Sequence, residues 1–228
     1  MGHVVIPCNT QDELNITGRE ILVKKINELT SKQDYVTLGI SGGRSVQGIF
    51  SLLKNETTLP WGKVHIFLVD ERQVPLDHAD SNYKLGKDLF IDHLIKAVVL
   101  PQANLHPFDM NKELAAYNKE LTDHGGTLDI VLLGAGEDGH IGALFPNHAS
   151  VRNLANGYIK LNDSPKPPAD RVTISQSTLL KAKVAVLLFV SEAKQDAYNL
   201  FSADGPFETC PARLVKEIKN AYVLTWFR

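Results

Sequence analysis

The chain has 228 residues, of which 43% are hydrophobic and 22% charged, and these values are ordinary for a folded globular protein. Its formal net charge of -2 leaves no overall positive field, which excludes recruitment of nucleic acid or an anionic membrane by charge alone. The two cysteines, Cys8 and Cys210, match no metal-ligand spacing, and no secretory signal or membrane-spanning run is visible, so we expect free thiols and a cytoplasmic protein.

Helices and strands are predicted to alternate along the chain. Thr10-x-x-Glu13 is a capping-box pattern, and apolar residues at helical spacing follow it, which predicts a helix over 10–30. Short apolar runs rich in β-branched residues predict strands at 35–40, 64–69, 128–133, 171–174, 184–190 and 221–226. Helical spacing predicts further helices up to about Leu53 and at 80–95, 111–123, 192–202 and 211–219.

This alternation predicts an α/β fold with an open, mainly parallel, Rossmann-like sheet and helices on both of its faces. No internal repeat or low-complexity tract divides the chain, so we expect a single domain over 1–228, with room for a small subdomain near 140–170. The segment 162–169 contains three prolines and is predicted to be a surface loop.

Three of the predicted strands end in polar or glycine-rich sequences. Ligands of open parallel sheets bind beyond the carboxyl ends of the strands, so these three ends are the candidate site. The first is Ser41-Gly42-Gly43-Arg44-Ser45, where a glycine turn before a helix would present backbone N–H groups, hydroxyls and a guanidinium to an anion. A tight turn without a ligand is the simpler alternative, since neither the Walker spacing nor GxGxxG is present.

The second strand end is Asp70-Glu71-Arg72, which alone would be read as a surface ion pair. The third is Gly134 to Pro146, which includes Asp138-Gly139-His140. We expect a helix to begin near His140, so that its positive end keeps the imidazole neutral and able to accept a proton near pH 7. The other seven histidines have no such setting and are interpreted as ordinary surface or packing residues.

Together these motifs resemble the 6-phosphogluconolactonases, within the superfamily that includes glucosamine-6-phosphate deaminase and ribose-5-phosphate isomerase. The stretches that carry the resemblance occur in the family's order and are Ser41–Ser45, Val69–Pro75, Ser81–Tyr83, Leu132–Pro146, Arg171–Ile174 and Lys194. Two positions depart from the usual pattern: Val46 replaces a proline after the glycine loop, and Ser191 replaces a glycine three residues before Lys194.

The resemblance implies the fold of the ribose-5-phosphate isomerases and glucosamine-6-phosphate deaminases. It also implies hydrolysis of 6-phosphogluconolactone to 6-phosphogluconate, the second step of the oxidative pentose phosphate pathway. His140 would be the general base that activates water. The phosphate would be bound by Ser41, Gly42, Gly43, Arg44, Ser45, Arg171 and Lys194.

Some roles stay open at this point. Either Arg72 or backbone N–H groups around Gly139 would stabilise the oxyanion, and either Asp70 or Asp138 would orient His140 or bind sugar hydroxyls. The sequence contains no HxxH, HExxH or cysteine cluster, so we expect neither a metal nor a nucleotide cofactor.

Two other functions are compatible with the same elements. The first is a glucosamine-6-phosphate deaminase or isomerase, although such enzymes usually have tyrosine where this chain has Arg72 and continue toward Asn-Glu-Pro where it has Leu144-Phe145-Pro146. The second is a sugar-phosphate sensor without catalysis, which normally carries a DNA-binding domain for which this chain has no room. The expected partner is a small sugar-phosphate lactone, with no nucleic acid and no membrane.

Overall fold

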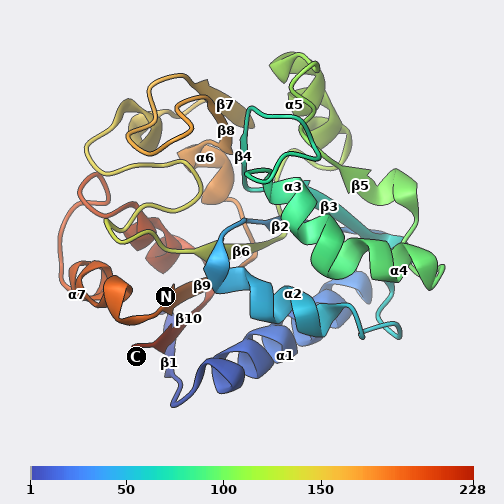
Figure 1. Cartoon of the computed structure of the whole chain (residues 1–228), viewed down its shortest axis with the longest axis horizontal. Coiled ribbons are helices and arrows are strands. Elements are labelled where there is room, and N and C mark those ends of the chain that lie inside the picture. Colours follow the sequence, from blue (N-terminus) through green and yellow to red (C-terminus); the bar gives the residue numbers. More distant parts are fainter. Residues whose placement is uncertain (1) are drawn as a thin grey trace.

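The computed structural model describes residues 2–228, which form an α/β fold around a seven-stranded sheet (Figure 1). All neighbouring strands of this sheet are parallel. In spatial order they are β1 (Val4–Pro7), β10 (Asn220–Trp226), β9 (Val184–Val190), β6 (Ile130–Gly134), β2 (Val36–Ile40), β3 (Val64–Leu68) and β5 (Leu105–His106). The predicted parallel sheet is confirmed.

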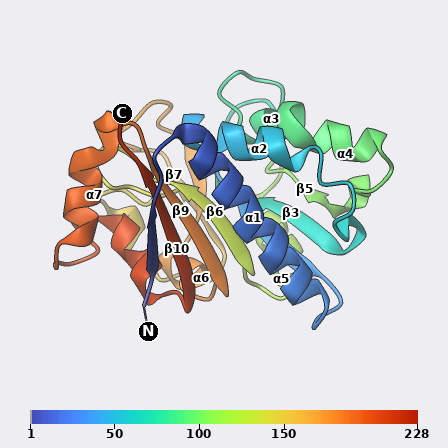
Figure 2. The same ribbon diagram turned by 90° about the horizontal axis from the view of Figure 1, so that it is seen from below.

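Helices cover both faces of this sheet, as Figure 2 shows. They are α1 (Gln11–Thr30), α2 (Gln47–Leu53), α3 (Asn82–Gly86), α4 (Asp92–Lys96), α5 (Leu114–Asp123), α6 (Gln176–Leu179) and α7 (Gln195–Ser202). A π-helical turn, Lys87–Ile91, joins α3 to α4, so the helix predicted over 80–95 is present with one irregular turn. The helix predicted over 211–219 is a 3-10 helix, Pro211–Glu217. None of the helices within 2–228 is both long enough and apolar enough to cross a membrane.

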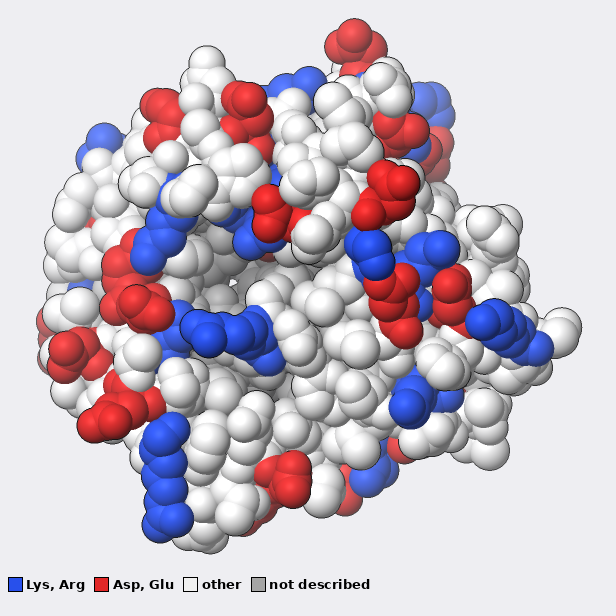
Figure 3. Space-filling view, in the orientation of Figure 1, with Lys and Arg blue, Asp and Glu red and all other residues white. Residues whose placement is uncertain are grey.

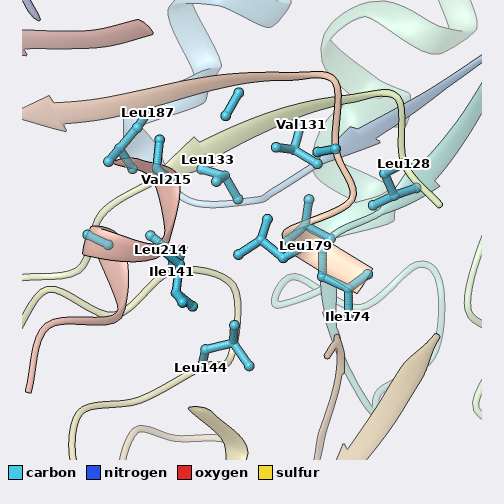
Figure 4. Packing of buried hydrophobic residues seen from close by; sticks show 14 of the residues in the cluster. Leu128, Val131, Leu133, Ile141, Leu144, Ile174, Leu179, Leu187, Leu214 and Val215 are labelled. Atoms are coloured by element: carbon cyan, nitrogen blue, oxygen red, sulfur yellow. The ribbon is translucent and has the colours of Figure 1, made fainter. Parts of the chain in front are cut away.

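Side chains alternate between two hydrophobic cores along each central strand. In β6, Ile130 and Leu132 pack with α1 and α2 on one face, while Val131 and Leu133 pack toward α5 and α7 on the other. Strands buried on both faces explain the continuous apolar runs of the sequence. Figure 4 shows that Ile141 and Leu144, from the segment that follows β6, pack in the second core near Leu133, so this core also anchors the candidate site loop.

A smaller antiparallel sheet stands beside the first. Its strands, in spatial order, are β4 (Asp70–Arg72), β8 (Arg171–Ile174) and β7 (Tyr158–Leu161). Two expectations are corrected here. Residues 70–72, expected only as the polar end of the strand over 64–69, form a strand of their own, and 171–174 belongs to this second sheet rather than to the parallel one. The chain passes from β3 into β4 with only Val69 between them, and Ile174 N–H donates to the Val69 carbonyl at 2.8 Å.

The short strands β1, β5 and β7 were not predicted. Each has four residues or fewer, which is too short for hydrophobic periodicity to distinguish from a loop. The predicted loop at 162–169 is present, between β7 and β8.

The order of the strands reverses between β2 and β6. From β2 the chain continues outward through β3 to β5, whereas from β6 it continues outward through β9 to β10. Loops leaving neighbouring strands in opposite directions open a crevice at such a switch point, which is where ligands of open α/β sheets bind. The segments after β2 and β6 are Ser41–Ser45 and Ala135–His140, so the topology brings two of the three sequence motifs together.

Candidate active site

A cleft of ≈ 340 Å³ lies at this switch point. Figure 3 shows a hollow on this face of the molecule with Lys and Arg atoms along its border. Ten of the twelve residues predicted for the site line the cleft: Ser41, Gly42, Gly43, Arg44, Ser45, Asp70, Arg72, His140, Arg171 and Lys194. The two exceptions are Asp138 and Gly139, which lie behind His140 in the same loop.

The Ser41–Ser45 segment has the geometry of an anion-binding turn. Gly43 has φ of +90°, which favours glycine, and a Cβ atom on Gly42 would lie 1.8 Å from Asn82 Oδ1. Gly43 is therefore favoured by its backbone conformation, and Gly42 by the close approach of the Asn82 side chain. Their N–H groups have no acceptor within 2–228, and a 3-10 turn, Arg44–Val46, leads from them into α2. Unused backbone donors beside an exposed arginine form a cradle for a negatively charged group.

Lys194 approaches the same turn from the other side of the switch point. It lies at the end of a 3-10 turn, Glu192–Lys194, directly after β9, and its side chain is only 16% exposed. Burial lowers the pKa of Lys194, Glu137 acts in the opposite direction, and the positive charges of Lys166 and Arg44 lower the pKa further. Positive groups that repel one another in a partly buried cleft are stabilised when an anion binds between them.

Arg171 serves the fold as well as the cleft. Its side chain is buried, with Nε donating to the Pro168 carbonyl at 3.2 Å and Nη2 donating to the Pro167 carbonyl at 3.0 Å. These bonds tie the proline-rich loop to β8. Nη1 remains, and it lies 3.7 Å from Asp70 Oδ2. Nη1 is therefore the guanidinium nitrogen that can donate to a ligand while it remains near Asp70.

His140 is paired with Asp138. Nδ1 of His140 lies 2.5 Å from Asp138 Oδ1, which also accepts from the His140 backbone N–H at 3.2 Å. Burial alone would raise the pKa of the Asp138 carboxyl, but the hydrogen bonds and charge of His140 outweigh it and hold that pKa well below its usual value. Asp138 is thus a carboxylate that accepts the Nδ1 proton. No partner is found for Nε2 of His140 among the residues described, and the ring lines the cleft.

The helix expected to begin near His140 is absent. Residues 141–148 form turns, and the next helical segment is the 3-10 turn Ala149–Arg152. The group that faces His140 is therefore the Asp138 carboxylate and not the N-terminus of a helix. The two candidate aspartates have different partners in the structure. Asp138 contacts His140, whereas Asp70 contacts Arg171.

Two backbone N–H groups of the Gly139 loop already have acceptors. Gly139 N–H donates to the Gly136 carbonyl at 3.1 Å, and His140 N–H donates to Asp138. Arg72 Nη1 donates to the Asp80 carbonyl at 2.6 Å, while its Nε is buried without a partner. Arg72 Nε is therefore a donor that the protein leaves unused, unlike the N–H groups of Gly139 and His140.

Arg72 is one of three cleft residues with a buried polar atom that lacks a protein partner. The others are Ser41 Oγ and Trp226 Nε1. Buried polar groups are nearly always hydrogen-bonded in native proteins. Three such groups in residues that line one cleft are consistent with a site built around a polar ligand or water.

Nine cleft residues were not predicted as site residues. Four of them belong to the third motif, Gly134, Ala135, Gly136 and Gly142, and the other five are Gln11, Asn82, Val190, Ser191 and Trp226. Asn82 Nδ2 donates to the Asp70 carbonyl at 2.8 Å, and Glu71, buried behind the cleft, accepts from the backbone N–H groups of Asn82 and Tyr83. These contacts link β4 to α3. The matching stretch Ser81–Tyr83 was the available signal for Asn82. Ser191 has φ of +85°, in the region that favours glycine, which is the residue usual at this position in the resembling family.

Comparisons with known proteins identify the family of this chain. The family model described as glucosamine-6-phosphate isomerases/6-phosphogluconolactonase matches residues 9–226. A 6-phosphogluconolactonase of Borreliella burgdorferi is 33% identical over 205 residues, covering 87% of this chain and 87% of that protein. A probable 6-phosphogluconolactonase of Arabidopsis thaliana is 36% identical over 219 residues, covering 85% of this chain and 81% of that protein.

Solved structures show the same fold. A 6-phosphogluconolactonase of Thermotoga maritima superposes with a TM-score of 0.86 at 23% identity, covering 99% of this chain and 100% of that one. A monomeric glucosamine-6-phosphate deaminase superposes with a TM-score of 0.81 at 22% identity, covering 98% and 97%. The match over residues 9–226 and the two relatives above 30% identity decide the family, and this chain belongs to the glucosamine-6-phosphate isomerase/6-phosphogluconolactonase family.

Proposed function

We propose that this protein is a 6-phosphogluconolactonase that hydrolyses 6-phosphoglucono-1,5-lactone to 6-phosphogluconate, the second step of the oxidative pentose phosphate pathway. One observation carries the proposal: a single cleft is lined both by His140, which is paired with the Asp138 carboxylate behind it, and by a group of donors and cations suited to a phosphate. The curated relatives named 6-phosphogluconolactonase support it.

His140 is the general base of the proposed reaction. Its Nε2 removes a proton from water as the water oxygen attacks the lactone carbonyl carbon, and Asp138 stabilises the imidazolium that forms. The tetrahedral intermediate then breaks the bond between the carbonyl carbon and the ring oxygen, and His140 returns its proton to that oxygen. The product acid ionises to the carboxylate. Every proton in this cycle is held by water, His140 or the sugar.

Arg72 is the proposed donor to the oxyanion of the intermediate, since its Nε is buried without a partner. A fixed donor in a partly buried site stabilises the developing charge more than water does. Arg72 Nη1 is held by the Asp80 carbonyl, which restrains the guanidinium before substrate arrives.

The Ser41–Ser45 turn is the proposed binding site of the substrate phosphate. The unused N–H groups of Gly42 and Gly43, the Arg44 side chain and the Lys194 ammonium supply the donors, and Arg171 Nη1 completes the positive side. The net charge of -2 gives a dianionic substrate no long-range attraction, so this local cluster must provide its recognition.

A hydrolysis assay with freshly generated 6-phosphogluconolactone, corrected for spontaneous opening, tests the proposal. We expect rapid hydrolysis, and a much lower kcat/KM for unphosphorylated gluconolactone. Equal kcat/KM for the two lactones would remove the phosphate assignment. Release of ammonia from glucosamine 6-phosphate, without lactone hydrolysis, would instead establish a deaminase. Binding of sugar phosphates with no turnover of either substrate would establish a sensor.

A further inference from the structure

Three histidines from distant parts of the sequence meet at one point of the fold outside the cleft. His65 lies on β3, His106 lies on β5, and His124 caps the carboxyl end of α5. One ring nitrogen of each lies within 4.8 Å of the other two. His65 Nδ1 and His106 Nε2 are only 2.9 Å apart. Within 2–228, no other group of three or more histidine, cysteine or acidic side chains converges in this way.

The hydrogen bonds of these histidines restrict their tautomers. His124 Nδ1 lies 2.7 Å from the Glu120 carbonyl oxygen, which can only accept, so Nδ1 carries the proton and Nε2 does not. His65 Nδ1 and His106 Nε2 share one hydrogen bond, in which one ring donates to the other. A metal ion between these two nitrogens replaces that shared proton, and each ring then carries its own proton on the nitrogen that faces away from the ion.

One side of the triad is apolar, because the ring of Phe67 stacks on His106 at 4.1 Å between centroids. Metal ions bind neutral imidazole, through the ring nitrogen that carries no proton.

We propose that His65, His106 and His124 form a binding site for a borderline first-row transition-metal ion, of which Zn²⁺ is the best fit. Zinc binds histidine nitrogen at about 2.0–2.1 Å in tetrahedral geometry, which places two ligand nitrogens roughly 3.3 Å apart. The His65–His106 pair at 2.9 Å needs only a sub-ångström opening to reach this spacing. His124 and Tyr35 line a surface hollow, which gives an ion a path from solvent and water a place in the fourth position.

Glu120 lies beside two of the three histidines. Metal-binding histidines usually donate their other N–H to a carbonyl or carboxylate. The Glu120 carbonyl accepts from His124 Nδ1, and the Glu120 carboxylate lies 3.8 Å from His106 Nδ1. The Lys112 ammonium contacts Glu120 Oε1 at 2.5 Å, which holds the carboxylate in place. The ion would join β3, β5 and α5, so the role assigned to it is structural.

None of the three histidines lines the cleft. Removal of the ion with a chelator should therefore lower the melting temperature and leave lactone hydrolysis unchanged. The two measurements distinguish this proposal from the proposed function. Zinc binding without lactone hydrolysis would support the metal site and contradict the lactonase. Lactone hydrolysis without zinc binding would support the lactonase and contradict the metal site.

The test is a titration of the full-length, chelator-treated protein with Zn²⁺ by calorimetry and with Co²⁺ by visible absorption. We expect one ion per chain, tetrahedral cobalt bands, and a melting temperature that rises with Zn²⁺ concentration. Glu120→Gln should weaken binding by roughly 10–100-fold, and His124→Gln, which removes a ligand, should weaken it further. Glutamine at position 124 can still donate to the Glu120 carbonyl, so the metal-free variant should fold.

Two matched variants locate the ion. His93→Gln removes an exposed histidine of α4, and His140→Asn removes the histidine of the cleft. Both should bind Zn²⁺ as the wild type does. Wild-type protein that binds no ion, or a His124→Gln variant that binds as tightly as the wild type, would overturn the proposal and leave the triad as metal-free packing.

Discussion

The cleft and the histidine triad use the same side chain in two different surroundings. In the cleft, His140 Nδ1 faces a carboxylate at 2.5 Å, whereas in the triad His65 Nδ1 faces another imidazole at 2.9 Å. The closest carboxylate oxygen to a triad nitrogen is Glu120 Oε2, at 3.8 Å from His106. A carboxylate carries a negative charge that stabilises the imidazolium formed when histidine accepts a proton, whereas a neutral imidazole carries no such charge and can offer a nitrogen lone pair to a metal ion. The partner thus determines whether a histidine favours proton transfer or metal binding.

The largest expected effect is on the cleft side of this comparison. His140→Ala should lower kcat by roughly 10²–10⁴-fold, because general base catalysis contributes about that much. The side chain is 19% exposed at the border of the cleft, so the melting temperature should change little. Stopped-flow or pH-stat hydrolysis at saturating substrate measures the loss. His124→Gln, the matched histidine of the triad, should keep wild-type kcat. Near-wild-type turnover in folded His140→Ala would remove the proposed base.

A smaller effect is expected from the positive side of the cleft. Lys194→Met should lower kcat/KM for the phosphorylated lactone by about 10–100-fold, since a charge-assisted hydrogen bond contributes roughly 1.5–3 kcal/mol. Hydrolysis of unphosphorylated gluconolactone should stay near its already low rate. Lys96→Met, at an exposed position of α4, is the matched control and should change neither rate. A loss on both lactones alike would indicate damage to the fold instead.

Arg171→Ala should show the same substrate preference but with lower stability. It leaves the buried Asp70 without its ion-pair partner and releases the carbonyls of Pro167 and Pro168. Comparing its melting temperature with that of Lys194→Met separates the two roles of Arg171. Equal stability of the two variants would show that the proline-rich loop does not depend on this arginine.

The pairing of Asp138 with His140 predicts a pH dependence. A carboxyl whose pKa is depressed by folding stabilises the protein above its unfolded pKa, and this contribution is lost as pH falls through the folded value. The wild type should therefore be more stable than Asp138→Asn near neutral pH, and the difference should shrink below roughly pH 4. Urea denaturation at a series of pH values measures it. A constant difference across this range would contradict the pairing.

The smallest expected effect concerns the backbone at Ser191. A non-glycine residue at φ of +85° costs about 1–3 kcal/mol, and glycine relieves this strain while losing roughly 0.5–1 kcal/mol through greater freedom in the unfolded chain. Ser191→Gly should thus raise the free energy of unfolding by about 1 kcal/mol. Ser202→Gly, at the last residue of α7, should instead lower it slightly. Destabilisation by Ser191→Gly would show that the serine side chain compensates for its backbone.

Much of the cleft was predictable because its residues follow strands that are themselves easy to recognise. Buried parallel strands such as β6 appear as unbroken apolar runs, and the glycines and polar residues after them mark the ends where ligands bind. The resemblance to a known family then connected Arg171 and Lys194 to the same site. Some predictions were wrong, such as the helix expected near His140. They depended on local backbone geometry, which a glycine-rich sequence leaves undetermined.

The sequence by itself determined the alternation of elements, the family and ten of the residues that line the cleft, because these depend on contiguous stretches with strong local patterns. Only the tertiary structure decided which aspartate serves His140, that Arg171 also secures a loop, and that His65, His106 and His124 converge. These relations join residues far apart in the chain or depend on the rotation of individual side chains. They exist only after strand order and packing have brought the elements together, so no local pattern records them.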